Sequence, residues 1–186
     1  MVLGGARSGK SGFAQERVCE LASLDDPVYY VATAFIKDDE MARRVERHRS
    51  DRPDGWITLE AQREVHKAIE RLPVRSILLL DCVTMMITNF MFDQRTDWDD
   101  LSKEDEDRLI SSTLSYVDQV LMAIRGRSIK AVLVSNEVGM GLVPPYPLGR
   151  IFRDIAGWVN QAIAKEADSV FLLTAGIPQR IKGEPR

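Results

Sequence analysis

The residues with the clearest chemical signature form the run GGARSGKS at residues 4–11. It fits the pattern G-x-x-x-x-G-K-[ST], in which glycines let the backbone curl so that consecutive N–H groups point at phosphate oxygens. In such a loop Lys10 reaches the outer phosphates and the Ser11 hydroxyl ligates Mg²⁺. An apolar run precedes the loop and an amphipathic segment follows it, which favours this interpretation over a glycine-rich turn with an exposed lysine. The predicted nucleotide-binding residues are Gly4, Gly5, Ala6, Arg7, Ser8, Gly9, Lys10 and Ser11.

A carboxylate that suits such a loop follows a second apolar run. Residues 77–80 read ILLL, and Asp81 comes directly after them. Phosphoryl transfer needs a cation fixed opposite the lysine, so Asp81 is predicted to hold Mg²⁺ or its water together with Ser11. The alternative is an aspartate that only ends a strand or caps the next helix. The presence of a phosphate loop favours the metal role.

A second group of chemically active residues lies in DDEMARRVERHRSDRP at residues 38–53. A neutral imidazole at His48 can attack the α-phosphorus of a nucleoside triphosphate, expelling pyrophosphate and leaving a phosphoramidate. Neighbouring guanidinium groups neutralise phosphate charge and disfavour the imidazolium form. The alternative is a half-buried packing histidine on a helix face shared with Met41 and Val45, and the residues alone leave both readings open. His66 lies among charged residues and is expected at the surface without a role.

The elements that must position these residues alternate along the chain. Short apolar runs typical of buried strands lie at residues 1–3, 28–32, 77–80, 131–135 and 170–173. Helical stripes run through Ala14, Val18 and Leu21, through Ile110, Leu114, Val117, Leu121 and Ile124, and through Ile151, Ile155, Trp158 and Ala162. The acidic residues 93–107 are expected to form a solvated loop. This alternation predicts an α/β fold, a mostly parallel sheet flanked by helices, in a single domain spanning residues 1–186.

Composition excludes several other classes of protein. The net charge of −3 argues against a duplex-DNA or other nucleic-acid binder. No apolar run approaches the roughly 18 residues of a membrane span. The two cysteines form no CxxC pair, which argues against zinc or redox chemistry and suits a reducing compartment. We therefore predict a cytoplasmic protein.

Six runs in this order carry a family resemblance: GGARSGKS, YVAT at residues 30–33, DDEMARRVERHRSDRP, LLLDCVTMMITN at 78–89, SNEVGMGLVP at 135–144 and FRDIAGWVNQ at 152–161. Together they resemble the bifunctional adenosylcobinamide kinase / adenosylcobinamide-phosphate guanylyltransferase family of cobalamin biosynthesis. The resemblance extends from Val2 to about Pro178.

The resemblance implies a RecA-like P-loop NTPase fold, a homotrimer and two reactions. The enzyme would phosphorylate adenosylcobinamide with ATP or GTP, then transfer GMP from GTP to adenosylcobinamide phosphate through a guanylylated histidine, with Mg²⁺ as cofactor. The matching histidine is His48, and Lys10 would be the second catalytic residue. Besides the phosphate loop, the implied nucleotide contacts are Thr33, Ala34, Arg49, Ser50, Asp51, Arg52, Glu60 and Asp81.

Some features depart from the family pattern or leave alternatives open. Arg47 stands where some relatives have a second histidine, and Ala34 stands where a hydroxyl residue is common. Residues 136–141 either close over a ligand at a strand end or form a glycine-rich turn. The alternative functions are a P-loop small-molecule kinase in which His48 is inert and a non-catalytic nucleotide-binding module.

Overall fold

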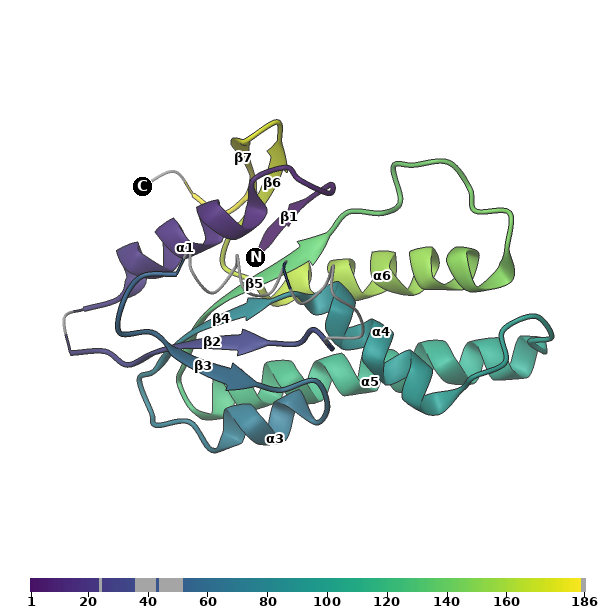
Figure 1. Ribbon diagram of the computed structural model, residues 1–186, viewed down its shortest axis with the longest axis horizontal. Helices are drawn as coiled ribbons and strands as arrows, with labels where there is room; N and C mark the ends of the chain where they lie inside the picture. The colour runs from purple at the N-terminus through teal and green to yellow at the C-terminus, as the bar shows by residue number, and fades with distance from the viewer. Residues whose placement is uncertain (24, 36–42, 44–51, 185–186) are drawn as a thin grey trace.

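The structure is a computed structural model that describes residues 1–23, 25–35, 43 and 52–184. Its centre is a seven-stranded sheet in the order β3-β2-β4-β5-β1-β6-β7 (Figure 1). The strands are β1 (Val2–Gly4), β2 (Val28–Ala32), β3 (Ile57–Glu60), β4 (Ile77–Asp81), β5 (Lys130–Asn136), β6 (Val170–Thr174) and β7 (Ile177–Lys182). Every adjacent pair is parallel except β6 and β7, which are antiparallel.

Helices cover both faces of the sheet. They are α1 (Lys10–Leu21), α3 (Val65–Glu70), α4 (Val83–Gln94), α5 (Lys103–Gly126) and α6 (Pro147–Glu166). The central strand β4 shows how the two faces are divided, because successive side chains point to opposite sides of a sheet. Ile77 and Leu79 join the core beneath α1, whereas Leu78 and Leu80 join the larger core formed with α3, α4, α5 and α6. The predicted sheet, mostly parallel and flanked by helices, is confirmed.

The five predicted strands and three predicted helices are present, and the described residues contain four further elements that were not predicted. The edge strands β3 and β7 contain no buried residue, and they lack the continuous apolar runs of the central strands. The α3 helix is only six residues long. The α4 sequence VTMMITNFMFDQ is apolar around most of its circumference, so it has no polar face to reveal a helical period.

Two detailed predictions are wrong. The predicted loop at residues 93–107 ends early, because α5 begins at Lys103, where the Ser102 hydroxyl accepts a hydrogen bond from the Asp105 N–H. In α6 the predicted stripe is rotated: Trp158 is 41% exposed, and Val159 and Ile163 are buried instead with Ile151 and Ile155. Among the described helices, none has the length and apolarity that crossing a membrane requires.

Candidate active site at the carboxyl edge of the sheet

The predicted site residues that the structure describes gather where the parallel strands end. Strand register places Ala32 of β2 opposite both Glu60 of β3 and Asp81 of β4. The end of β1 at Gly4 pairs with Asn136, the last residue of β5. Because parallel strands share one carboxyl edge, the phosphate loop between β1 and α1 opens at the same edge as Asp81 (Figure 1).

The phosphate loop has the tight backbone that its sequence predicts. A Cβ atom on Gly4 would lie 2.5 Å from the Leu173 carbonyl oxygen and 2.6 Å from Ser8 Oγ. Gly9, immediately before α1, has a φ of 90°, a conformation that glycine adopts without strain. Two backbone bonds fasten the loop to its neighbours: the Glu137 N–H donates to the Gly4 carbonyl at 3.0 Å and the Gly176 N–H donates to the Ser8 carbonyl at 3.1 Å.

Two polar side chains of the loop are buried in it. Lys10 is 8% exposed, and its ammonium donates a hydrogen bond to the Gly5 carbonyl, so it lies across the curled backbone. Ser8 Oγ is buried and has no hydrogen-bond partner among the described residues. A buried ammonium, a buried hydroxyl and curled amides at the start of a helix suit a bound polyphosphate.

Asp81 and Ser11 meet as predicted. The Ser11 hydroxyl donates to Asp81 Oδ2 at 2.8 Å, and the Tyr30 hydroxyl donates to the same oxygen at 3.2 Å. Burial, followed by the neighbouring Asp81 charge, raises the pKa of Tyr30, so the phenol stays protonated and keeps donating. The hydroxyl and carboxylate oxygens are hard donors of the type that Mg²⁺ takes alongside phosphates and water, so this pair fits the ion.

Arg52 contacts the ring of Tyr30, whereas Asp81 contacts its hydroxyl. Its guanidinium carbon is 3.4 Å from the centroid of the Tyr30 ring, and its Nη1 donates to the Thr58 hydroxyl at 2.7 Å. Arg52 Nε is buried and has no hydrogen-bond partner in the described part of the chain. The structure therefore brings one of the predicted arginines next to the Ser11–Asp81 pair.

Of the other predicted nucleotide-binding residues, three lie in the described part of the chain and make contacts within the protein. Thr33 is fully buried, and its hydroxyl donates to the Cys82 carbonyl at 2.9 Å and accepts from the Cys82 N–H at 3.1 Å. Ala34 and Glu60 flank Gln62, whose amide donates to the Ala34 carbonyl at 3.5 Å and to Glu60 Oε2 at 3.2 Å. Nucleotide contacts by these three residues stay predictions. His48, Arg49, Ser50 and Asp51 lie outside the described residues.

Sequence reasoning gave no role to Tyr30 or to the polar side chains behind the site. Asn89 donates to the Thr33 carbonyl at 2.7 Å, and Asn136 donates to the Thr84 hydroxyl at 2.7 Å. The sequence did offer one signal for Tyr30, since it is a tyrosine within a buried strand. A buried phenol hydroxyl usually has a hydrogen-bond partner, so a polar neighbour could have been expected. His66 is half-buried and meets the Tyr116 ring edge-on at 5.8 Å, rather than lying free on the surface.

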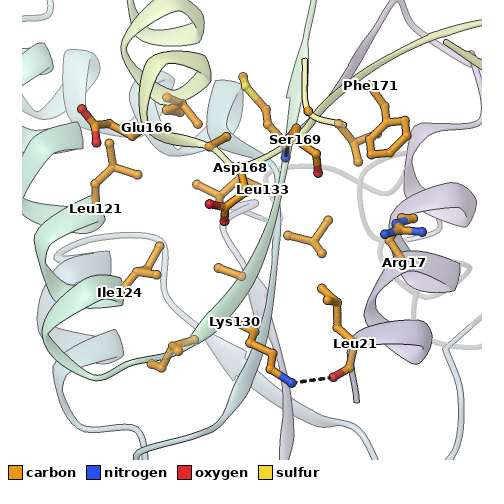
Figure 2. Close-up of a pocket in the computed structure, with 18 of the residues that line it drawn as sticks. Arg17, Leu21, Leu121, Ile124, Lys130, Leu133, Glu166, Asp168, Ser169 and Phe171 are labelled. Carbon is orange, nitrogen blue, oxygen red and sulfur yellow. Dashed lines mark hydrogen bonds between the residues drawn. The ribbon is translucent and has the colours of Figure 1, made fainter. Parts of the chain in front are cut away.

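The opposite edge of the sheet holds a cavity of about 740 Å³ that is separate from these residues (Figure 2). It lies where β5 and β6 begin, and Figure 2 shows Arg17, Lys130 and Asp168 among its lining side chains. The N-terminal ammonium of Met1 donates to the Ser169 carbonyl there at 2.8 Å. Burial lowers the pKa of this amine to about 6.

A solved structure shares the fold. It is described as a prototypical ATPase from the type III secretion system of pathogenic bacteria, and it superposes with a TM-score of 0.53 at 12% sequence identity. The match covers 93% of this chain and 50% of the ATPase chain, so this chain corresponds to half the length of that protein. At this identity the likeness concerns the fold alone, and it confirms the predicted P-loop NTPase class.

Three relatives are much closer in sequence. The chain is 41% identical over 183 residues to the bifunctional adenosylcobalamin biosynthesis protein CobU of Escherichia coli and 42% identical over 189 residues to CobU of Salmonella typhimurium, with 98% of each chain covered in both cases. It is 38% identical over 186 residues to the bifunctional adenosylcobalamin biosynthesis protein CobP of Pseudomonas aeruginosa, covering 100% of this chain and 98% of that one. The sequence pattern of one enzyme family matches residues 1–181. The chain therefore belongs to the cobinamide kinase / cobinamide phosphate guanyltransferase family.

Proposed function

We propose that this protein phosphorylates adenosylcobinamide and then transfers GMP from GTP to adenosylcobinamide phosphate, giving adenosylcobinamide-GDP and pyrophosphate in cobalamin biosynthesis. The observation that carries the proposal is the Ser11–Asp81 contact of 2.8 Å beside a buried Lys10, in a chain of this family. These are the parts that a P-loop enzyme uses to hold and polarise a nucleoside triphosphate.

The kinase step follows from the phosphate loop. The loop amides and the Lys10 ammonium hold the phosphates, and Ser11 and Asp81 would hold Mg²⁺. When bound, this ion neutralises charge on the transferring phosphoryl group. The acceptor hydroxyl of adenosylcobinamide forms a new bond to the γ-phosphorus while the bond to the nucleoside diphosphate breaks, and the hydroxyl proton is released.

The guanylyl step uses His48 as a nucleophile. An imidazole nitrogen bonds to the α-phosphorus of GTP and pyrophosphate leaves; a phosphate oxygen of adenosylcobinamide phosphate then displaces the histidine. Support comes from Arg52, which packs on the ring of Tyr30, the residue whose hydroxyl donates to Asp81, and which follows His48 by four positions. The covalent chain therefore limits the separation of their Cα atoms to about 14 Å. The Arg52 guanidinium supplies positive charge for the phosphates.

Labelling with GTP that carries ³²P at the α-phosphate tests this step. We expect acid-labile, alkali-stable label on the wild-type protein and on His66→Ala, and none on His48→Ala. Adding adenosylcobinamide phosphate should move the label to the corrinoid. A wild-type protein that phosphorylates adenosylcobinamide but never takes up label would leave the simpler kinase without a covalent histidine.

The same proposal extends to cofactor and assembly. We propose that Mg²⁺ is the metal, that ATP or GTP drives the kinase step, and that residues 1–186 act as one domain in a cytoplasmic homotrimer. Light scattering should then give three times the chain mass of 21.0 kDa. A mass of one or two chains would contradict the trimer without affecting the chemistry.

A further inference from the structure

Tyr30 touches two groups that the proposed reaction uses, the carboxylate of Asp81 and the guanidinium of Arg52. Its hydroxyl donates to Asp81 Oδ2 at 3.2 Å, and the face of its ring lies 3.4 Å from the guanidinium carbon of Arg52. The residue is 4% exposed, so neither contact is a chance meeting of mobile surface side chains.

The strand order explains why one residue can make both contacts. Strand β2 lies between β3 and β4, and Tyr30 is in register with Thr58 on one side and Leu79 on the other. Asp81 is two residues beyond Leu79, so its side chain points to the same face as Tyr30. On the β3 side, Arg52 is fixed from two directions, because it stacks on Tyr30 and donates to Thr58 Oγ1 at 2.7 Å.

Each contact restricts a group that the proposed chemistry needs. Asp81 Oδ2 accepts from both Ser11 and Tyr30, and two donors on one oxygen restrict rotation of the carboxylate. The Tyr30 ring and the Thr58 hydroxyl each contact the Arg52 guanidinium, and the two contacts together restrict its movement.

We propose that Tyr30 is a positioning residue with two roles: its hydroxyl orients Asp81 for metal-dependent phosphate chemistry, and its ring orients Arg52 for guanylyl transfer. This inference rests on the proposed function. The ordinary alternative is a buried core tyrosine whose contacts only contribute to stability.

Substitutions that remove the hydroxyl and the ring separately test the two roles. Tyr30→Phe keeps the ring face that packs on Arg52 and removes the hydroxyl that donates to Asp81, so the Mg²⁺ concentration at half-maximal labelling should rise about tenfold. At saturating Mg²⁺ its labelling rate should return to within about twofold of wild type. Tyr30→Leu should label about tenfold more slowly even at saturating Mg²⁺, because the cation–π contact is lost.

Arg52→Lys provides an independent arm, since it keeps the charge and loses the planar stack. It should reproduce the slow labelling of Tyr30→Leu with an unchanged Mg²⁺ requirement. The double variant that combines Tyr30→Leu and Arg52→Lys should label no more slowly than either single variant, because both changes remove the same contact. This arm keeps the test valid if Tyr30→Leu fails to fold. The matched control is Tyr29→Phe, at the neighbouring position, whose side chain packs against the core on the other face.

The outcomes are distinguishable. An unchanged Mg²⁺ requirement in Tyr30→Phe, or wild-type labelling by Arg52→Lys at every Mg²⁺ concentration, overturns the inference. So does a fully additive double variant. A wild-type protein without any label contradicts the proposed function itself.

Discussion

Gly4 occupies the tightest position of the phosphate loop. A methyl group there would collide with the Leu173 carbonyl on β6, which is backbone, and with the Ser8 hydroxyl inside the loop. Gly12, which lies within α1, is exposed and has no atom within 4 Å of an added Cβ. The two positions therefore differ in packing although both residues belong to the same short segment.

Gly4→Ala should destabilise the protein by about 2 kcal/mol, because either β6 or the loop must move to admit the methyl group. Gly12→Ala should be neutral or stabilising by up to about 1 kcal/mol, since alanine favours the helix. Urea unfolding without nucleotide measures both. Equal stabilities for the two variants would contradict the close approach at Gly4.

Among the elements, α5 illustrates how a helix start is fixed by side chains rather than by its apolar stripe. Ser102 caps the helix by accepting from the Asp105 N–H at 3.1 Å, and the first turn contains Glu104, Asp105 and Glu106. Acidic residues are favourable at the positive end of a helix. The acidic run that resembles a solvated loop in sequence is thus partly the first turn of α5.

Ser102→Ala should reduce the free energy of unfolding by about 1 kcal/mol through loss of this cap. The matched control is Ser111→Ala within α5, where the hydroxyl bonds back to the Asp107 carbonyl at 2.8 Å. That change should stay within about 0.5 kcal/mol of wild type. Urea unfolding monitored by circular dichroism compares the two, and a larger loss at Ser111 would refute the capping role.

The sequence could predict those elements and residues whose pattern lies within one continuous stretch of the chain. The central strands β2, β4 and β5 are buried on both faces and read as apolar runs, and the phosphate loop is one continuous motif. Asp81 could be predicted because it ends such a strand. The contact between Tyr30 and Arg52 could not, because it depends on β2 lying between β3 and β4, an order that no local pattern encodes.

At the scale of the whole molecule, the two edges of the sheet have different properties. The carboxyl edge holds the proposed site, whereas the amino edge holds the cavity and the buried amine of Met1. Met1 is 7% exposed, and the pKa of its amine, about 6, lies below the ordinary value of 8.0 chiefly because burial disfavours the charged form. The folded protein therefore binds this proton more weakly than the unfolded chain does.

Stability should consequently rise with pH between about 6 and 8. Below pH 6 the amine is charged in both states and the folded state carries the cost of burial; above pH 8 it is neutral in both. The expected gain is about 3 kcal/mol, measured by urea unfolding at several pH values. N-terminally acetylated protein is the control and should lack this component. Parallel pH profiles for the two forms would contradict it.

The short first strand has a practical consequence for handling the protein. β5 begins at Lys130, but its pairing with β1 begins only at Val134, opposite Val2. The β5 residues before that point, 130–133, line the cavity. A purification tag fused to Met1 would therefore replace the buried amine that donates to the Ser169 carbonyl at 2.8 Å beside this cavity. Tags at the two ends of the chain should for this reason change the melting temperature by different amounts.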